Sequence, residues 1–257
     1  MNKTLQKTKL NIDLIGFHGQ TIFHDPEKKI TKQLGDGKLL SQLTKKKVVY
    51  NFRQNDLDNG GQGAPLTPIF HNVIANKINK EFNLEFPINI LNIGGISNIT
   101  SAVRWKDLWH TNKIYAYDIG PGNCLIDEWI RKNSKNNYDS KGSIARSGKV
   151  DKLIFNQALE NFNHNSRYEK SLDVNDFDIF FAKGLSLENG AATITDFTAK
   201  IISEGINYIH GKNQLLNDKW LVCGGGRKNE YLLESVSYTH LRAHETSLHL
   251  VCRLLLE

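Results

Sequence analysis

Residues 117–129, YDIGPGNCLIDEW, constrain the fold more than any other part of this sequence. The apolar residues 114–116 before them predict a short buried strand, and Asp118 stands where we expect that strand to end. Gly120 and the Pro-Gly pair after it predict a tight turn, and Asn123 is a good N-cap for the helix that the following apolar spacing predicts. The pattern predicts a carboxylate beside a glycine-rich turn and the free N–H groups of a helix, which suit an anion or a sugar hydroxyl. The simpler alternative is that Asp118 only caps the turn and the glycines only bend the chain.

The composition is typical of a soluble globular protein. Of the 257 residues, 39% are hydrophobic and 23% are charged. No apolar run reaches the roughly 18 residues that a membrane helix needs, and the N-terminus lacks the apolar segment of a secretory signal. The three cysteines are far apart, which favours a reducing compartment and gives neither a disulfide framework nor a metal site. We therefore expect a cytoplasmic location, no membrane partner and no protein-bound metal centre.

The basic charge does not indicate a nucleic-acid partner. The net charge of +6 comes from lysines scattered along the chain. A nucleic-acid groove more often gathers arginines with aromatic side chains. A nucleic-acid-binding module is therefore the least favoured class of function.

Hydrogen-bonding groups follow the strands expected in the first part of the sequence. Residues 12–17 and 45–52 predict buried strands, and each leads into polar residues or glycines. An imidazole, amides, a hydroxyl, a guanidinium and a carboxylate suit a polyhydroxylated ligand, although they could also simply satisfy turns. These candidate residues are His18, Gln20, Thr21, Arg53, Asp56, Gly61 and Gln62.

Two further glycine segments follow predicted strands. Residues 87–100 predict a hairpin that turns at Gly94 and Gly95 beside Asn92, and such a turn can direct main-chain N–H groups at phosphate oxygens. A plain hairpin is the local alternative. The second segment follows a strand over residues 220–223 and precedes a helix that begins at residue 230; it contains Gly224, Gly225, Gly226 and Asn229. A glycine triplet alone is a weak indicator of a nucleotide site.

The clearest predicted helix covers residues 189–209, where isoleucines recur at three- and four-residue steps and Gly211 suits the C-cap. By contrast, residues 236–257 break with the composition of the chain, because they contain no Lys, Asn or Gly. We interpret this stretch as a non-native tail outside the fold.

Together, five stretches resemble the anhydro-N-acetylmuramic acid kinase family, in order and spacing, over residues 12–233. They are HGQTIFH at 18–24, NFRQNDLDNGGQGAPLTPIFH at 51–71, LNIGGISNIT at 91–100, YDIGPGNCLIDEW at 117–129 and VCGGGRKN at 222–229. The resemblance implies an α/β, actin/hexokinase-like ATPase fold, with two lobes that each hold a mixed β-sheet flanked by helices. It divides the chain into the remainder of an N-terminal lobe (1–116), a C-terminal lobe (117–235) and the tail (236–257).

The resemblance also implies an activity and roles for residues. The family opens the anhydro bridge of 1,6-anhydro-N-acetylmuramic acid with water and phosphorylates O6, using ATP and Mg²⁺, in the recycling of cell-wall amino sugars. Asp118 matches the base that activates the water, and Arg53 could pair with the lactyl carboxylate. The sugar side would comprise His18, Gln20, Thr21, Arg53, Asp56, Gly61, Gln62, Gly120 and Asn123. The nucleotide side would comprise Asn92, Gly94, Gly95, Gly224, Gly225, Gly226 and Asn229. A homodimer is compatible with this reading.

The sequence departs from the family pattern at several places. Ile119 follows the base where the family has Thr, and residues 170–173, KSLD, match the family only loosely. The family's Gly-Thr-Ser-x-Asp-Gly phosphate loop is not found, so we expect a fragment truncated at both ends, inactive and poorly soluble by itself.

Two rival functions remain open. One is a non-catalytic protein of the same fold that binds an amino sugar or a nucleotide. The other is a glycoside hydrolase that pairs Asp118 with Asp127 or Asp56, which would require the two carboxylates at a suitable separation.

Overall fold

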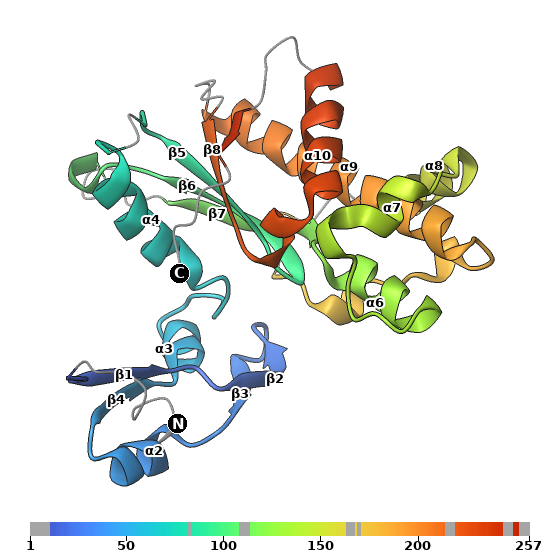
Figure 1. Ribbon diagram of the computed structural model, residues 1–257. Helices are drawn as coiled ribbons and strands as arrows, with labels where there is room; N and C mark the ends of the chain where they lie inside the picture. Colours follow the sequence, from blue (N-terminus) through green and yellow to red (C-terminus); the bar gives the residue numbers. More distant parts are fainter. Residues whose placement is uncertain are drawn as a thin grey trace. The chain divides into compact units, whose positions relative to one another are not determined.

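The computed structural model describes residues 11–81, 84–107, 114–162, 168, 171–213, 219–243 and 249–251. The chain forms two compact units, residues 1–66 and 67–257, each of which combines strands with helices (Figure 1). The predicted mixed α/β class, with sheets flanked by helices, is confirmed. The two compact units divide after residue 66, residues 116 and 117 both lie in strand β7 (Tyr115–Pro121), and the division into lobes at that point stays a prediction.

The first unit contains two small sheets. Strands β1 and β4 pair in parallel, β2 and β3 pair in antiparallel fashion, and helices α2 and α3 follow β3 and β4. Asp36 caps α2 by accepting hydrogen bonds from two backbone N–H groups. The bounds are β1 Leu14–Phe17, β2 Gln20–Asp25, β3 Ile30–Leu34, α2 Gly37–Thr44, β4 Lys47–Tyr50 and α3 Phe52–Asp58.

The second unit is built on a five-stranded sheet with the order β7-β6-β5-β8-β9. The strands are β5 Ile88–Ile93, β6 Ile96–Ala102, β7 Tyr115–Pro121, β8 Lys219–Cys223 and β9 His249–Val251. β5, β6 and β7 are antiparallel neighbours, whereas β8 runs parallel to β5 and β9 parallel to β8. The predicted hairpin is confirmed as β5 and β6. The three glycine segments singled out above lie at or just beyond the ends of β5, β7 and β8.

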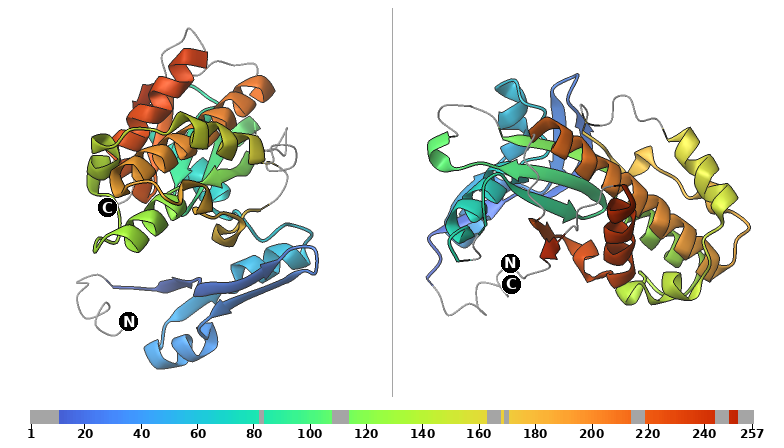
Figure 2. Two further views of the ribbon diagram at one scale, coloured as in Figure 1. Left: turned by 90° about the vertical axis from the view of Figure 1, so that its right-hand side faces the viewer. Right: turned by 90° about the horizontal axis from the view of Figure 1, so that it is seen from above.

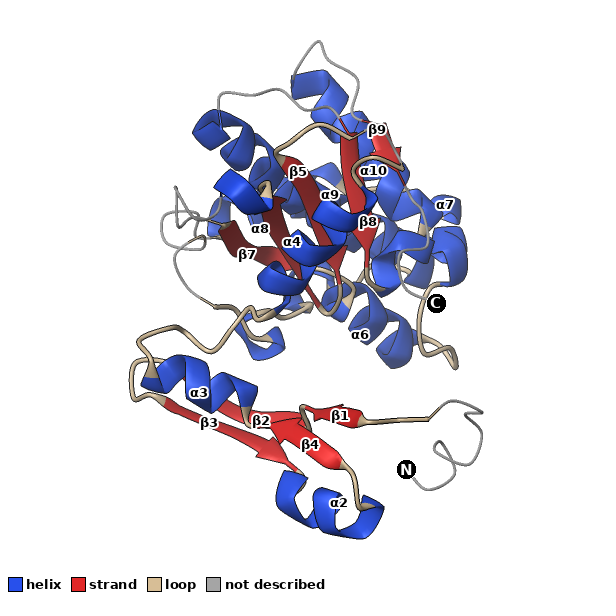
Figure 3. Ribbon diagram, turned by 90° about the vertical axis from the view of Figure 1, so that its left-hand side faces the viewer, coloured by secondary structure: helices blue, strands red, loops and turns tan. Residues whose placement is uncertain are grey.

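Helices cover both faces of this sheet. Figure 3 looks onto the face that α4 covers, and Figure 2 shows the long α9 along the other side of the sheet. Helices α6, α7, α8 and α10 pack on α9. The bounds are α4 Thr67–Ile78, α6 Cys124–Asn133, α7 Ser143–Ser147, α8 Lys152–Asn161, α9 Leu187–Asn213 and α10 Glu230–Ala243, with short 3₁₀ turns η1 Ser140–Gly142, η2 Val174–Asp176, η3 Phe180–Ala182 and η4 Gly225–Lys228.

The core follows the alternation of the strands. On the α9 side, Leu91 and Ile93 of β5 and Ile99 of β6 are fully buried with the isoleucines of α9. On the α4 side, Ile88 and Ile90 form a smaller cluster with residues of α4 and β8. Each such side chain contributes about 1.5–3 kcal/mol when it leaves water, so the sheet is held between two apolar layers.

Two details differ from the sequence-based expectations. β7 continues through Asp118 to Pro121 instead of ending at Asp118. A bulge in its pairing with β6 lets both Ile119 and Gly120 face α9, where they contact Gly205 and Ile201, so packing extends the strand through the predicted turn. Helix α9 runs through Gly211 to Asn213, so Gly211 is not its C-cap.

Helix α10 crosses the start of the predicted tail, since it runs to Ala243. Residues 244–248 and 252–257 of that tail lie outside the described residues, and the tail's non-native origin stays a prediction. None of the helices in the described ranges has the combined length and apolar character that crossing a membrane requires.

Candidate functional site

The turn between β5 and β6 is joined to the start of α6 by main-chain hydrogen bonds. The carbonyl of Gly95 accepts from the N–H groups of Gly122, at 2.8 Å, and Cys124, at 3.2 Å. The carbonyl of Gly94 accepts from the N–H of Asn123 at 2.8 Å. The expectation that these N–H groups are free for an anion is therefore wrong, because the neighbouring turn supplies their acceptors. Asn123 does precede α6 as predicted, but its side chain makes no cap bond and instead donates to the carbonyl of Ile93 at 3.5 Å.

The loop after β8 packs against the same two segments. A Cβ atom at Gly224 would overlap the carbonyl oxygen of Ile93, and one at Gly226 would overlap the Ile93 side chain. A Cβ atom at Gly225 would lie 3.6 Å from the Asn123 amide nitrogen. The glycines thus permit the main chain of this loop to approach the end of β5, which brings the three predicted glycine segments together at one edge of the sheet.

Asp118 is buried next to this junction, with 6% of its surface exposed. It pairs with Asn98 across the β6–β7 ladder, beside the bulge. Its Oδ2 atom accepts hydrogen bonds from the backbone N–H of Leu172 at 2.9 Å and from the Ser171 hydroxyl at 3.5 Å. These donors fix the position of the carboxylate.

The segment that holds Asp118 is the KSLD stretch, which sequence reasoning matched only loosely to the family. Val174, just after it, lies against the turn of β5 and β6, where a Cβ atom at Gly95 would be 3.4 Å from the Val174 Cγ1 atom. Residues 171–174 therefore connect the carboxylate with the glycine junction. Ser171 and Leu172 were not predicted as site residues; Lys170 lies outside the described residues.

A cavity of about 940 Å³ opens beside the loop after β8. Three predicted residues line it, namely Asn123, Gly225 and Asn229, whereas Asn92, Gly94, Gly95, Gly224 and Gly226 do not. Its wall also carries four cationic side chains and a tyrosine that sequence reasoning missed: Arg131, Lys141, Arg227, Lys228 and Tyr138. The carboxyl groups of Asp127 and Glu230 lie in the same wall, and burial raises the pKa of Asp127.

Asn229 directly precedes α10 and lines the cavity. Its Oδ1 atom accepts from the N–H of Leu232 at 3.0 Å, which caps the helix. Gly142, at a φ of 74°, packs so closely that a Cβ atom there would overlap the same Oδ1 atom. The position of Asn229 is therefore determined both by its own helix and by the chain at Gly142.

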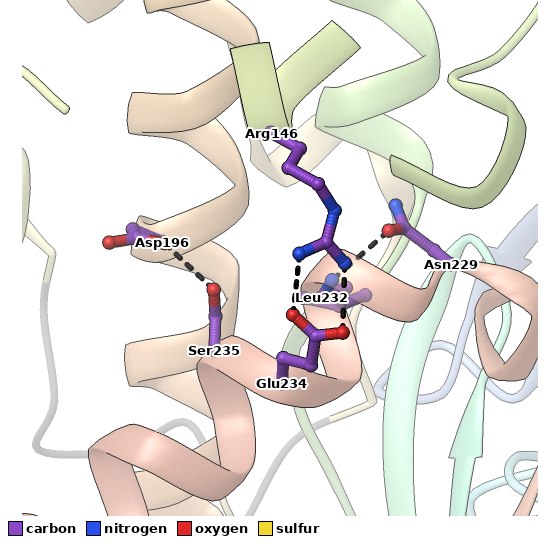
Figure 4. Close-up of polar contacts among 6 residues, drawn as sticks. All are labelled: Arg146, Asp196, Asn229, Leu232, Glu234 and Ser235. Atoms are coloured by element: carbon purple, nitrogen blue, oxygen red, sulfur yellow. Dashed lines mark hydrogen bonds and ion pairs between the residues drawn. The ribbon is translucent and has the colours of Figure 1, made fainter. Parts of the chain in front are cut away.

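Two polar pairs tie α10 to its neighbours (Figure 4). Arg146 of α7 forms a two-bond ion pair with Glu234, each bond 2.8 Å long. The Ser235 hydroxyl donates to Asp196 of α9 at 2.9 Å. Burial raises the pKa of Asp196, while the hydrogen bond from Ser235 opposes that rise.

In the first unit, His18 and Arg53 form one hydrogen-bonded group. The Nε atom of Arg53 donates to Nε2 of His18 at 2.8 Å, and its Nη1 atom donates to the carbonyl of Gly63 at 2.8 Å. His18 places its Nδ1 atom 2.7 Å from the carbonyl of Gly19. These partners assign the imidazole hydrogen to Nδ1 and leave Nε2 as the acceptor. His18 also lines a cavity of about 340 Å³ in this unit.

The other predicted sugar-side residues mainly support the loops. Asp56, on α3, accepts the N–H of Gly63 at 2.8 Å, and Gly61 packs directly on its carboxylate. The Thr21 hydroxyl accepts from Gln33 at 3.3 Å. Gln20 and Gln62 are exposed, and Gln20 donates to the carbonyl of Thr21 at 3.4 Å.

Within the described residues, no three His, Cys, Asp or Glu side chains are grouped so that they could hold a metal ion.

Comparison with known proteins matches most of this chain to a single family. The sequence model of the family described as anhydro-N-acetylmuramic acid kinase matches residues 1–248. A relative with that description from Pelagibacter ubique is 49% identical over 235 residues, which cover 90% of this chain and 60% of the relative. Another from Methylobacterium nodulans is 40% identical over 239 residues, or 93% of this chain and 60% of that protein. The chain thus spans about 60% of the length of these curated relatives.

Among solved structures, the chain is similar to the activator of the 2-hydroxyisocaproyl-CoA dehydratase from Clostridium difficile with bound ADPNP. The TM-score is 0.42 and the sequence identity is 13%, over 92% of this chain and 86% of that one.

Proposed function

Because this chain belongs to the anhydro-N-acetylmuramic acid kinase family, we propose that the protein is an ATP-dependent kinase of 1,6-anhydro-N-acetylmuramic acid. It opens the anhydro bridge with water and phosphorylates O6, which yields N-acetylmuramic acid 6-phosphate. The observation that carries this proposal is the convergence of the three glycine segments at one sheet edge, beside a buried carboxylate. A reaction of this kind takes place in the cytoplasm, where recycled sugar and ATP are both present.

Asp118 acts as the general base in this proposal. A base must hold its carboxylate within hydrogen-bond reach of the attacking water, in a fixed orientation. The donors from Ser171 and Leu172 both reach Oδ2 of the carboxylate, and in this proposal Oδ1 takes the proton of the water. Because the site is largely buried, bulk water has little access to the charge that develops there.

The cavity beside Gly225 and Asn229 receives the nucleotide. Its volume of about 940 Å³ is at the upper end of the roughly 300–1,000 Å³ typical of ligand pockets. Lys141, Arg227 and Lys228 supply positive charge for the phosphates of the nucleotide. Tyr138 offers an aromatic face on which its adenine ring can stack. ATP supplies the phosphoryl group that is transferred. Mg²⁺ enters with the nucleotide, because it keeps several waters and is bound mainly through the substrate phosphates.

The sugar is bound by the loops of the first unit. Arg53 is oriented by His18 and by the carbonyl of Gly63, so its guanidinium is preorganised to pair with the lactyl carboxylate of the sugar. Preorganisation lowers the conformational entropy that binding would otherwise cost. Gln20 and Gln62 are placed at the surface, where their amides can bond hydroxyl groups.

The experiment incubates the protein with 1,6-anhydro-N-acetylmuramic acid, with and without MgATP, and follows sugar products by mass spectrometry and ADP by a coupled assay. It uses the longest version that the coding sequence allows, and the chain of 257 residues, for which we expect no turnover, is the comparison. We expect N-acetylmuramic acid 6-phosphate only when MgATP is present, with one ADP per sugar. Ring opening without ATP would indicate a hydrolase, and sugar binding without any product would indicate a binding protein; either result would overturn the proposal.

A further inference from the structure

Four polar side chains form a line in the layer between α4 and the sheet. Thr100 of β6 has its hydroxyl 2.8 Å from Nδ1 of His71 on α4. Nε2 of His71 lies 4.0 Å from Sγ of Cys223, at the end of β8. The same sulfur lies 3.5 Å from Oδ1 of Asn92, near the end of β5. Asn92 and Cys223 are register partners in the parallel pair of β5 and β8, so the line ends beside the glycine junction.

Burial fixes the protonation states along this line. Only 8% of His71 is exposed, and desolvation lowers the pKa of its imidazole to about 4. Desolvation also raises the pKa of the Cys223 thiol to about 11. Near neutral pH the histidine therefore carries one ring hydrogen, and the cysteine keeps its S–H.

These states give the line a single direction. Oδ1 of Asn92 has no hydrogen, so the Cys223 thiol must be the donor to it. The sulfur can then accept from the Nε2–H of His71, and Nδ1 of His71 accepts from the hydroxyl of Thr100. Every hydrogen points toward Asn92. Desolvation disfavours a thiolate at Cys223, and the hydrogen bonds of this line use only the thiol form.

The space around Asn92 supports the same orientation of its amide. A Cβ atom at Gly224 would lie only 2.6 Å from Oδ1 of Asn92, so the oxygen faces the end of β8. Nδ2 of Asn92 is on the other side, 3.9 Å from where a Cβ atom of Gly94 would be. Asn92 as a whole is half-buried, and it is the second-last residue of β5, just before the turn into β6.

We propose that Cys223 and His71 are positioning residues, which hold the Asn92 amide so that its NH₂ group faces the Gly94–Gly95 turn and donates to a phosphate oxygen of a nucleotide that extends from the cavity at Gly225 to this turn. The phosphate contact of Asn92 rests on the proposed kinase function. The orientation of the Asn92 amide rests on the geometry alone. Without the thiol donor, the amide can rotate by half a turn and present its oxygen to the phosphate, which repels that oxygen.

The test compares variants that keep or remove each donor. Cys223→Ser keeps a hydroxyl donor, whereas Cys223→Ala removes it. His71→Gln keeps an amide N–H near the position of Nε2, whereas His71→Phe does not. Cys124→Ala is the matched control, because Cys124 is also half-buried, burial raises the pKa of its thiol to about 11 as well, and its side chain is outside the line.

The first readout is the pair of NMR signals of the Asn92 side-chain NH₂ group, assigned through Asn92→Asp. The second is the dissociation constant of MgADP by calorimetry, followed by KM for ATP and kcat where turnover is seen. In Cys223→Ala we expect the NH₂ signals to shift and MgADP to bind about five- to tenfold more weakly, the usual effect of one lost hydrogen bond, with kcat little changed. In their NH₂ signals and their affinity for MgADP, Cys223→Ser and His71→Gln should differ less from the parent chain than Cys223→Ala and His71→Phe do.

Unchanged NH₂ signals in Cys223→Ala would overturn the proposed orientation, as would an equal loss of MgADP affinity in Cys124→Ala. If the parent chain binds no MgADP at all, the proposed nucleotide site fails, and with it the phosphate contact of Asn92. The NMR signals would then still decide whether the line of hydrogen bonds orients the amide. All variants are first compared by circular dichroism and unfolding midpoint, so that loss of folding is recognised separately.

Discussion

The backbone N–H of Leu172 donates to the carboxylate of Asp118 over 2.9 Å, although 54 positions of sequence separate the two residues. Through this bond, Leu172 helps to hold in place the carboxylate that we propose as the general base. A main-chain donor cannot be removed by a side-chain substitution at Leu172, so the test of this relationship has to be made at Asp118 itself.

Asp118→Asn should keep the fold and sugar binding but lower the rate of sugar phosphorylation on the order of a hundredfold or more. The amide oxygen can still accept from Leu172, whereas the amide cannot take a proton from water. The rate is measured at saturating sugar and MgATP, together with the unfolding midpoint. Asp178→Asn, which changes an exposed carboxylate a few residues beyond Leu172, is the control and should leave the rate unchanged. Near-normal turnover in Asp118→Asn would remove Asp118 from the mechanism.

Gly224→Ala should destabilise the chain, whereas Gly225→Ala should not. Gly224 has a φ of 81° and would bring its new methyl group onto the carbonyl of Ile93, which costs about 1–3 kcal/mol. At Gly225 the added methyl group would lie 3.6 Å from the Asn123 amide, an ordinary contact, so we expect a change of no more than about 1 kcal/mol. Urea unfolding of both variants measures the difference. Equal effects at the two positions would contradict the close approach of this loop to β5.

His71 should make the stability of the chain depend on pH in the mildly acidic range. Desolvation lowers the pKa of its imidazole from 6.5 to about 4 in the folded state. Between these values the unfolded chain binds more protons than the folded one, so the stabilisation is complete above pH 6.5 and is lost as the pH falls toward 4.

In His71→Gln this part of the pH dependence should disappear. The difference in unfolding free energy between the parent chain and the variant should change between pH 7 and pH 4 by up to about 3 kcal/mol. Urea unfolding at several pH values measures it. His18→Gln is the comparison variant, and parallel pH profiles for the parent chain and His71→Gln would show that His71 is accessible to protons in the folded state.

Much of the local structure could be predicted from the sequence. The apolar alternation around Gly94 and Gly95 predicted the β5–β6 hairpin, and the order strand, glycine triplet and Asn229 predicted the start of α10. These signals are local: glycine permits the turn, and periodicity assigns the element on either side. Asn123 was placed correctly before α6 for the same reason.

What could not be predicted depends on contacts between distant segments. The end of β7 was misplaced because the bulge opposite β6 and the packing of Ile119 on α9 outweigh the turn preference of the Gly-Pro-Gly sequence. The N–H groups at the start of α6 were expected to be free because their acceptors, Gly94 and Gly95, belong to another hairpin. The line from Thr100 through His71 and Cys223 to Asn92 joins four separate elements, and no spacing in the sequence indicates it.

The start of the predicted tail can be tested by truncation. The change of composition after Ser235 predicts that removing residues 236–257 leaves the unfolding midpoint unchanged. The structure leads to a different expectation, because Val236 is fully buried on α10 and its carbonyl accepts a hydrogen bond from Ser203 at 3.3 Å. Burial of a valine side chain contributes about 1.5–3 kcal/mol, so a cut after Ser235 should lower the midpoint.

A second truncation after Ala243, which keeps all of α10, is the matched control. Its unfolding midpoint should be closer to that of the full chain than the midpoint of the shorter truncation is. Val236→Ala in the full chain tests the side chain without removing any helix, and we expect it to destabilise by about 1–2 kcal/mol. Thermal and urea unfolding measure all three. If the cut after Ser235 and Val236→Ala both leave the midpoint unchanged, the break in composition marks the end of the folded part of the chain, and α10 is sustained by residues 230–235 alone.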